Sequence, residues 1–371
     1  MEFGGCTLEI VGMTPEFWKG KKVFITGHTG FKGSWLVLWL KNLGAIVTGY
    51  SLEPPTNPNL FELARVESGI NHLYGDIRKL EALDNAIATY RPEIVVHLAA
   101  QSLVRVSYEE PVDTYATNVM GTVNVLEAVR RNPGTIKCVL IVTSDKCYQN
   151  KEWLRGYKEE DAFGGFDPYS NSKGCAELVT SAYRNSFFNT NNYDEHGVSV
   201  ASVRAGNVIG GGDWAKDRLF TDVMNGFLQG KAVEIRSPNA IRPWQHVLEP
   251  LSGYLALCEH MWREGPAFAE GWNFGPDRES AKPVSWIVEQ IGTLLGDEFE
   301  WEVDKNPNPH EATYLYLDST KAKEQLNWSQ KLSLEKTLEW IVEWYSEYKS
   351  NGDLEKITNQ QIVKYQALSE L

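Results

Sequence analysis

Two short segments of the chain carry side chains that could transfer protons. Tyr169 and Lys173 stand four residues apart, so in a helix they share one face and lie one turn from each other. An ammonium beside a phenol favours the phenolate and lowers the tyrosine pKa from its usual value of about 10. Tyr169 is therefore a candidate general base. Such pairs are also common as solvated neighbours on helix surfaces. The other residues of the site must therefore distinguish a catalytic pair from a surface pair.

The second segment is Thr143-Ser144-Asp145-Lys146, which follows an apolar stretch, 137–143, with the composition of a buried strand. The Ser144 hydroxyl could hydrogen-bond a reacting oxygen, or simply cap the strand end. Asp145 and Lys146 add an acid and an amine, which suits a second proton transfer. Burial would raise the pKa of Asp145 and lower that of Lys146, as acid–base work requires, whereas an ion pair would shift both back. The sequence leaves both possibilities open.

A glycine-rich turn is the element that must position a cofactor beside these groups. A predicted strand ends at Gly27, and apolar residues recur at helical spacing from Trp35. Glycine lets the backbone approach a pyrophosphate, and the start of a helix offers free N–H groups and a positive dipole end. A tight turn with nothing bound is the alternative, but the strand and helix around it favour a dinucleotide site. The residues expected to contact the cofactor here are Gly27, His28, Thr29, Gly30, Phe31 and Gly33.

Alternating strands and helices follow the glycine turn. The expected strands are 45–50, 72–74, 94–98 and 137–143, and the expected helices between them are 60–66, 78–90 and 108–130. Repeated strand–helix units predict a doubly wound parallel α/β sheet of the Rossmann type, with ligands at the carboxyl ends of the strands.

Residues that follow the second and third strands are candidates for the adenosine half of a dinucleotide. Glu53 comes late for a ribose contact, so the residues leave the choice between NAD and NADP open. Asp76 and Ile77 follow the third strand and suit the adenine. Asp76 could equally cap the helix 78–90.

The fourth strand is followed by Ala99 and Gln101, near which backbone could lie against the cofactor. Asn118 interrupts the apolar stripe of the predicted helix 108–130. A buried asparagine usually braces neighbouring backbone, and we expect Asn118 to do so beside the cofactor, within the cofactor site.

Composition limits the possible partners. A net charge of −13 argues against a nucleic-acid partner, because no basic surface would neutralise phosphates. The cysteines form no Cys-x-x-Cys pair, which favours reduced thiols in the cytoplasm over a disulfide framework or zinc site. They are Cys6, Cys138, Cys147, Cys175 and Cys258. The apolar run 35–40 is too short to cross a membrane. His246 and His310-Glu311 have no metal-ligand spacing.

The later half of the chain has a different pattern. Strands are expected at 198–204, 232–235 and 272–274, and helices at 172–185, 218–229, 248–262, 284–295 and 334–349. We expect an amino-terminal arm over 1–20, which lacks the pattern of a signal peptide. A dinucleotide-binding domain over 21–204 and a substrate-binding lobe over 205–371 should follow. The boundary is approximate, and the two parts are expected to interleave.

The glycine spacing after Thr26, with Ser144, Tyr169 and Lys173, resembles the motifs of the extended short-chain dehydrogenase/reductase superfamily. The segment 143–146 is similar to the Thr-Asp-Glu segment of its nucleotide-sugar 4,6-dehydratases, with lysine in place of the glutamate. That lysine, the segment Gly27–Gly33 and the later segment Ile241–Val247 resemble the branch of this family that acts on CDP-D-glucose. The resemblance extends from about Phe17 to about Tyr345.

The resemblance implies an NAD-dependent dehydration. C4 of the sugar is oxidised with Tyr169 as base, Lys146 removes the C5 proton, protonated Asp145 assists the departing 6-hydroxyl, and hydride returns to C6. Alternatives are an epimerase, a dehydratase of another nucleotide sugar, or a dinucleotide-sensing regulator without turnover. Asp145 and Lys146 disfavour the epimerase, and the intact Tyr169–Lys173 pair disfavours the regulator.

The substrate diphosphate requires positive charge, for which Arg204, Arg218 and Arg242 are candidates. Arg242 matches a family position that contacts the diphosphate, and a guanidinium suits bidentate phosphate binding. Asn207 and Asn273 resemble family positions that hold diphosphate and nucleotide, although both could merely brace loops. The helices 108–130 and 172–185 resemble those of an intersubunit four-helix bundle, which implies a homodimer or homotetramer.

Overall fold

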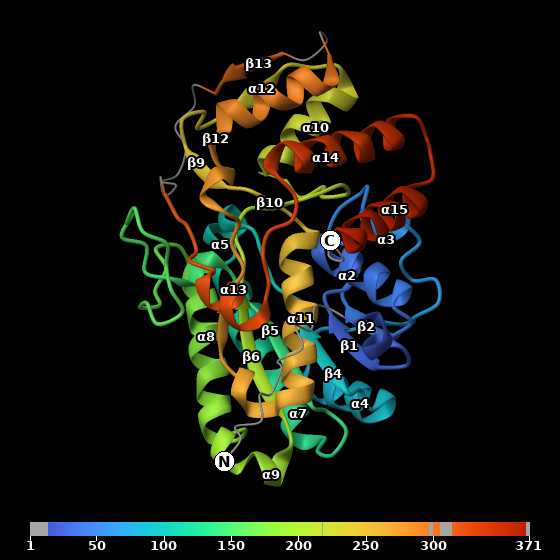
Figure 1. Ribbon diagram of the computed structural model, residues 1–371, viewed down its shortest axis with the longest axis vertical. Helices are drawn as coiled ribbons and strands as arrows, with labels where there is room; N and C mark the ends of the chain where they lie inside the picture. Colours follow the sequence, from blue (N-terminus) through green and yellow to red (C-terminus); the bar gives the residue numbers. More distant parts are fainter. Residues whose placement is uncertain (1–13, 217, 297–299, 305–313, 369–371) are drawn as a thin grey trace, which may run out of the picture.

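A parallel sheet of seven strands forms the centre of the protein (Figure 1). The computed structural model describes residues 14–216, 218–296, 300–304 and 314–368, so most of the expected arm, Cys6 and His310-Glu311 lie outside the described residues. The strand order is β11-β6-β5-β4-β1-β2-β3, and every pair is parallel. The strands are β1 (Lys22–Thr26), β2 (Ile46–Ser51), β3 (Asn71–Tyr74), β4 (Ile94–His97), β5 (Cys138–Val142), β6 (Ser199–Arg204) and β11 (Gly271–Asn273). The predicted doubly wound α/β fold is therefore confirmed.

Helices cover both faces of the sheet, which is why its central strands are apolar throughout. All residues of β4 and β5 are buried, as expected for strands covered on two sides. One face packs against α2 (Phe31–Asn42) and α11 (Leu248–Glu264). The other packs against α4 (Leu80–Tyr90), α7 (Gly121–Arg131) and α8 (Pro168–Ser186).

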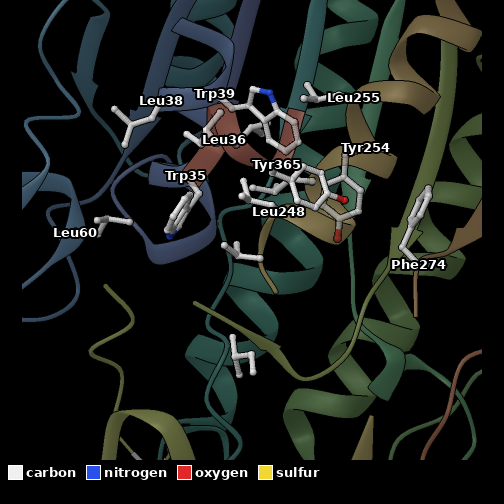
Figure 2. Close-up of a cluster of buried hydrophobic side chains, with 14 of the residues drawn as sticks. Trp35, Leu36, Leu38, Trp39, Leu60, Leu248, Tyr254, Leu255, Phe274 and Tyr365 are labelled. Carbon is white, nitrogen blue, oxygen red and sulfur yellow. The ribbon is translucent and has the colours of Figure 1, made fainter. Parts of the chain in front are cut away.

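The larger apolar core surrounds α2 and continues into the last helix (Figure 2). Trp39 of α2 contacts Tyr365 of α15 (Leu354–Ala367) edge to face, with 5.6 Å between ring centroids. The sequence analysis did not predict α15. Its apolar residues are few, but Asp353 caps its start by accepting a hydrogen bond from Lys356 N.

The predicted helix 108–130 is not one helix. The chain forms α5 (Val104–Glu109), α6 (Pro111–Tyr115), the π-helical turn η1 (Ala116–Met120) and then α7. Pro111 explains the first break, because a proline disfavours helical backbone in the residue before it. Glu110 accordingly has φ −127° and ψ 62°. The π-helical turn carries Asn118 inward.

The carboxyl-terminal half forms a smaller lobe, at the top of Figure 1, and also returns to the sheet through β11 and α11. Its helices are α10 (Leu219–Gln229), α12 (Val284–Leu295) and α14 (Leu334–Lys349), close to their predicted bounds. Its short strand pairs are β7 (Val208–Ile209) with β10 (Gln245–His246), β8 (Val233–Ile235) with β13 (Trp301–Val303), and β9 (Ile241–Pro243) with β12 (Ala281–Pro283). The return of β11 to the sheet supports interleaved domains, and the boundary near residue 204 stays a prediction.

Short elements complete the described chain. They are α1 (Pro15–Trp18), α3 (Leu60–Leu63), η2 (Asp145–Cys147), η3 (Thr190–Asn192), α9 (Tyr193–His196), η4 (Gly265–Phe268), η5 (Arg278–Ser280) and α13 (Thr320–Leu326). None of the helices in the described ranges combines the length and apolar content that a membrane span requires.

Candidate active site

A cleft of about 820 Å³ opens at the carboxyl ends of the strands, bordered by residues of the smaller lobe. It brings together most of the residues that the sequence indicated as candidates for the site. These are Gly27, Thr29, Gly30, Phe31, Gly33, Asp76, Ile77, Ala99, Gln101, Ser144, Asp145, Lys146, Tyr169, Lys173, Asn207, Arg218 and Arg242. His28, Asn118, Asn273 and Arg204 are not part of its lining.

The glycine turn is built for close backbone approach at one end of this cleft. Gly27 has φ +79°, and a Cβ there would lie 2.6 Å from Ala99 N. A Cβ on Gly33 would lie 2.2 Å from the Gly27 carbonyl oxygen. Folding of the turn therefore requires these two glycines. At Gly30 a Cβ would meet only that same oxygen, at 3.4 Å, so the bare Gly30 leaves room in the cleft instead.

Helix α2 starts directly at this turn and presents its first N–H groups beside the cleft. Gly30 is its N-cap and has no side chain to satisfy them, while Ser34 N already bonds to Gly30 O at 2.9 Å. A helix start with free N–H groups and a positive dipole end binds phosphate. Thr29 Oγ1 lies 2.8 Å from Ser51 Oγ and donates to Leu52 O at 3.0 Å, which fixes the turn to the end of β2. The residues at this end of the cleft fit a dinucleotide.

The side chain of His28 lies beneath the turn, which corrects the expectation that it faces a cofactor. His28 Nε2 is 2.7 Å from His72 Nδ1, and the ring is fully buried. Burial lowers the pKa of His28 to about 3, so the ring is neutral. It packs over the bare Gly49, where a Cβ would come within 2.3 Å of the ring.

Asp76 lines the cleft and is held by the residue two positions later. Its carboxylate accepts hydrogen bonds from Arg78 N at 2.9 Å and from the Arg78 guanidinium at 2.8–3.0 Å. These bonds hold the pKa of Asp76 below its usual value. Helix α4 begins later, with Lys79 as its N-cap, so the suggested capping role of Asp76 is wrong. Ile77 packs against the bare Gly121, where a Cβ would lie 2.4 Å away.

Asn118 braces the loop after β4, as the sequence predicts. It accepts a hydrogen bond from Gln101 N at 2.9 Å, and its Nδ2 donates to Gln101 O at 2.9 Å and to Ser172 Oγ at 2.8 Å. Gln101 reaches on to Thr114 Oγ1 at 2.9 Å. Asn118 therefore joins the cofactor end of the cleft to α8 without lining it.

Tyr169 and Lys173 lie in the first two turns of α8. The helix begins four residues before its predicted start, because Asp167 caps it by accepting from Ser170 N at 2.9 Å and Pro168 occupies its first position. Burial raises the pKa of Tyr169 to about 12, and Ser144 opposes this shift. Burial also lowers the pKa of Lys173 to about 8. The predicted lowering of the tyrosine pKa is thus not produced by the protein's own groups.

Ser144 and Asp145 meet Tyr169 at the end of β5. Ser144 Oγ donates to Asp145 Oδ1 at 2.9 Å and accepts from Lys146 N at 3.2 Å. Burial raises the pKa of Asp145, as its assignment as an acid requires. Lys146 lines the cleft with an exposed side chain, so the burial considered for it from the sequence is absent. Within the described residues, no ion pair of 4 Å or less joins Asp145 and Lys146.

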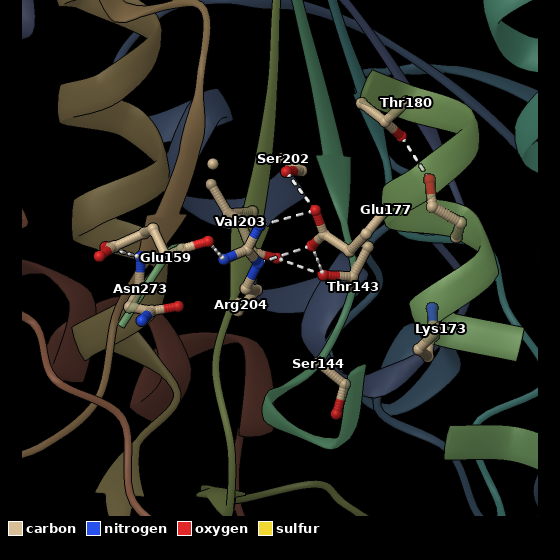
Figure 3. Close-up of polar contacts among 12 residues, drawn as sticks. Thr143, Ser144, Glu159, Lys173, Glu177, Thr180, Ser202, Val203, Arg204 and Asn273 are labelled. Carbon is tan, nitrogen blue, oxygen red and sulfur yellow. Dashed lines mark hydrogen bonds and ion pairs between the residues drawn. The ribbon is translucent and has the colours of Figure 1, made fainter. Parts of the chain in front are cut away.

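Two of the three candidate arginines line the cleft. Arg242 lies on β9, and Arg218 donates to Asp213 Oδ2 at 2.6 Å and to Ser102 Oγ at 3.2 Å. Arg204 is different, because it is buried behind the cleft and paired with Glu177 (Figure 3). The suggestion that Arg204 binds the substrate anion is therefore wrong.

The two candidate asparagines also differ in position: one lines the cleft and the other is buried away from it. Asn207 lines the cleft with φ +47°, a conformation that asparagine tolerates better than most residues. Asn273 is fully buried and braces loops: its Nδ2 donates to Tyr157 O at 2.9 Å, and its Oδ1 accepts from the Tyr148 hydroxyl at 2.9 Å. A substrate contact of Asn273 is not supported.

Lys32, which lies within the segment Gly27–Gly33, is a functional candidate that was not predicted from the sequence. It lines the cleft in the first turn of α2. Burial and the nearby charges of Arg218 and Lys173 lower its pKa to about 8, and Asp145 opposes them. The sequence signal for Lys32 was the position of a lysine inside a predicted pyrophosphate-binding turn. In the described residues, no three His, Cys, Asp or Glu side chains gather where they could hold a metal ion.

The sheet order, the glycine turn and the Ser144–Tyr169–Lys173 cluster define the protein class: an extended short-chain dehydrogenase/reductase with a Rossmann fold. The model of the family described as GDP-mannose 4,6 dehydratase matches residues 24–341. The chain belongs to this family of dehydratases and is an enzyme of the hydro-lyase class.

Curated relatives agree with this assignment, and a solved structure shares the fold. A Salmonella typhimurium protein named CDP-glucose 4,6-dehydratase is 56% identical over 349 residues, which are 94% of this chain and 97% of that protein. A probable dTDP-glucose 4,6-dehydratase of Sinorhizobium fredii is 26% identical, over 88% of this chain and 93% of its own. The fold matches that of a Bacillus anthracis dTDP-glucose 4,6-dehydratase solved with NAD, with TM-score 0.72, 24% identity and coverage of 91% and 100%.

Proposed function

We propose that this protein dehydrates CDP-D-glucose to CDP-4-keto-6-deoxy-D-glucose with NAD held in the cleft. The observation that carries the proposal is the presence of the glycine turn, Ser144, Asp145, Tyr169 and Lys173 along one cleft. The 56% identical Salmonella relative, which bears the name of this activity, supports the choice of sugar and nucleotide.

The cofactor would lie with its pyrophosphate on the start of α2 and its adenosine half toward Asp76 and Ile77. Bound NAD⁺ would supply a positively charged hydride acceptor for C4 and, once reduced, the hydride that returns to C6. The lining of Ala99 and Gln101 continues this path toward Tyr169.

The protein's own groups would move the protons. Tyr169 takes the proton of the 4-hydroxyl, with Lys173 one turn away to favour the phenolate and Ser144 to hydrogen-bond the reacting oxygen. The 4-ketone then acidifies the C5 proton, because the carbanion is delocalised as an enolate. Asp145, whose pKa is raised by burial, would give its proton to the departing 6-hydroxyl.

We assign the removal of the C5 proton to Lys146, which lies next to Asp145 at the cleft. Exchange at C5 tests this step separately from the rest. In D₂O the wild-type protein should place deuterium at C5 of the product, and Lys146→Ala should lose both this exchange and turnover. Full exchange in Lys146→Ala would reassign the base, and Lys32→Ala would be the next variant to examine.

The diphosphate would be bound by Arg242 and Arg218, with Asn207 beside them. A chemical assay tests the whole proposal. Incubation with CDP-D-glucose should give a 4-keto-6-deoxy sugar, detected by its absorbance in alkali. Recovery of a C4-inverted sugar instead would favour an epimerase, and turnover only with dTDP- or UDP-glucose would overturn the cytidine assignment.

We also infer a homo-oligomer that pairs through α8 and the helices beside it. Large apolar side chains are exposed along the chain from α5 to α7, at Tyr108, Val112 and Met120, and on α8 and its C-cap, at Leu178 and Phe187. Sedimentation of the wild-type protein should give a dimer or tetramer, and Leu178→Glu should shift it toward monomer.

Because the described cysteines are free thiols, we place the protein in the cytoplasm.

A further inference from the structure

Glu177 is a buried carboxylate behind the cleft with no role in the chemistry proposed above. It lies on α8, one helical turn beyond Lys173, and is only 2% exposed. Its Oε1 accepts from Arg204 Nε at 2.8 Å, and its Oε2 accepts from Arg204 Nη2 at 2.9 Å and Ser202 Oγ at 2.6 Å. Thr143 Oγ1 also donates to it. Figure 3 shows these donors converging on one carboxylate.

These contacts tie the catalytic helix to the strand that carries Ser144. Thr143, which donates to Glu177, directly precedes Ser144 at the end of β5. Lys173 Nζ donates to Val142 O, one residue earlier, at 3.4 Å. Two successive turns of α8 are thus bonded to Val142, the last residue of β5, and to Thr143, which follows it. The distance between Ser144 and the Tyr169–Lys173 face depends on this double attachment.

Arg204 holds the carboxylate ionised and connects it to Tyr148 and, through it, to β11 at the edge of the sheet. Burial alone would raise the pKa of Glu177, but Arg204, Ser202 and Thr143 together hold it below its usual value. The guanidinium also donates to the Tyr148 hydroxyl, which donates to Asn273 Oδ1 at 2.9 Å. A buried charge with this many donors is held in one geometry.

Glu177, one helical turn beyond Lys173, is also a negative charge that acts on its ammonium. The other titratable groups acting on Lys173 are Cys147 of η2, Lys32 of α2 and His97 of β4. Burial raises the pKa of Cys147 and lowers that of His97 to about 3, so both are neutral near pH 7. Lys32 carries the same sign as Lys173. Among these groups, only Glu177 stabilises the ammonium.

We propose that Glu177 is a positioning residue of the dehydration: held by Arg204, it fixes the Ser144 end of β5 against α8 and supplies the charge that balances the Lys173 ammonium. This inference rests on the proposed function for its catalytic consequence. It assigns Arg204, expected from the sequence to bind substrate, to the support of the catalytic helix instead.

The test removes the charge without leaving a buried ion unpaired. Glu177→Gln alone would strand the Arg204 guanidinium, whereas neutralising both partners of a buried pair is often tolerated. The double variant Glu177→Gln/Arg204→Gln should lower kcat about tenfold, with KM for CDP-D-glucose within about twofold. Because Lys173 loses its counter-charge, the alkaline limb of kcat against pH should move down by about one unit.

Single variants distinguish the effect of the Glu177 charge from the effect of its hydrogen bond to Thr143. Thr143→Val removes the bond beside Ser144 and should lower kcat without moving the alkaline limb. Thr180 is a buried hydroxyl one turn further along α8 that bonds only to Ala176 O, at 2.7 Å. Thr180→Val should leave both kcat and the limb unchanged. A folded double variant with a wild-type alkaline limb would overturn the proposal.

A second measurement does not depend on turnover. In protein labelled with [ε-¹³C]lysine, the Lys173 signal is assigned by its loss in Lys173→Arg and titrated by NMR. Its midpoint should be lower in the double variant than in the wild type, and an unchanged midpoint would contradict the charge role of Glu177. If the wild type failed to dehydrate CDP-D-glucose, the proposed function would fall, and this midpoint would still decide the inference about Glu177.

Discussion

Ser144 Oγ donates a 2.9 Å hydrogen bond to Oδ1 of Asp145, its neighbour at the end of β5. The bond joins the hydroxyl expected to hold the substrate oxygen to the carboxyl expected to protonate the leaving group. Burial raises the pKa of that carboxyl, and the bare Gly206 gives it room, since a Cβ there would lie 1.9 Å from Asp145 Oδ2. The carboxyl is thus fixed beside the reacting centre, and its pKa is shifted in the direction that favours the protonated form.

Asp145→Asn should stop water elimination while leaving the earlier oxidation intact. Asparagine keeps the shape and the acceptor for Ser144 but has no proton to give to the 6-hydroxyl. We expect kcat for product formation to fall by about 10²- to 10³-fold. Reduction of the cofactor in a single turnover, followed at 340 nm, should remain near the wild-type rate. Product formation at the wild-type rate would show that Asp145 is not the acid.

The pH dependence of turnover should report Lys173. Its pKa is lowered to about 8 by burial, and the ammonium is the form that favours the Tyr169 phenolate. Activity should therefore be retained below this value and fall as the pH rises through about 8. Lys173→Arg, which stays charged over the whole range, should abolish this limb even if kcat is reduced. A limb at the same pH in Lys173→Arg would have to come from another group.

The sheet could be predicted because each of its central strands is a compact apolar stretch. Ile94–His97 and Cys138–Val142 are buried on every residue, and strands of this kind are visible without knowledge of their neighbours. The pairing of Arg204 with Glu177 could not be predicted in this way. The two residues are 27 positions apart on different elements, and an arginine at a strand end has the same local sequence whether it binds substrate or a buried carboxylate.

Two further differences between the predicted and observed helices follow from residue types in the sequence. Pro111 disfavours helical backbone at Glu110, so the break between α5 and α6 follows from the residue type. Asp167-Pro168 is a common start for a helix, and it places Tyr169 inside α8. The orientation of His28 had no such signal, because its partner His72 lies 44 positions away, on β3.

Arg242 should determine substrate affinity more than rate. A guanidinium on a diphosphate contributes to ground-state and transition-state binding alike, so Arg242→Ala should raise KM for CDP-D-glucose about 10- to 100-fold and change kcat little. Arg65, which pairs with Glu355 on the surface at 3.5 Å, offers a control of the same charge change. Arg65→Ala should leave both constants unaltered. A normal KM in Arg242→Ala would shift diphosphate binding to Arg218.

Glu249 should make the stability of the fold depend on pH. This carboxyl lies at the start of α11 and accepts from Leu332 N at 2.8 Å and from the Tyr365 hydroxyl of α15 at 2.7 Å. Burial raises its pKa to about 7 in the folded protein, above its value of about 4.3 in an unfolded chain. The folded state therefore binds the proton more tightly, and this contribution to stability is present at low pH and lost as the pH rises toward 7.

Glu249→Gln removes that titration while keeping an acceptor for both donors. Relative to the wild type, its Tm should be higher near pH 8 than near pH 5 by a few degrees, because most of the wild-type contribution is lost between these two pH values. Thermal unfolding of both proteins at the two pH values measures the difference. Glu347 is half-buried; its backbone carbonyl accepts from Gly352 N and its side chain accepts from Asp353 N. Glu347→Gln provides the control, and its Tm difference from wild type should not grow between the two pH values. Equal Tm differences for Glu249→Gln at both pH values would mean that this carboxyl titrates alike in the folded and unfolded chain.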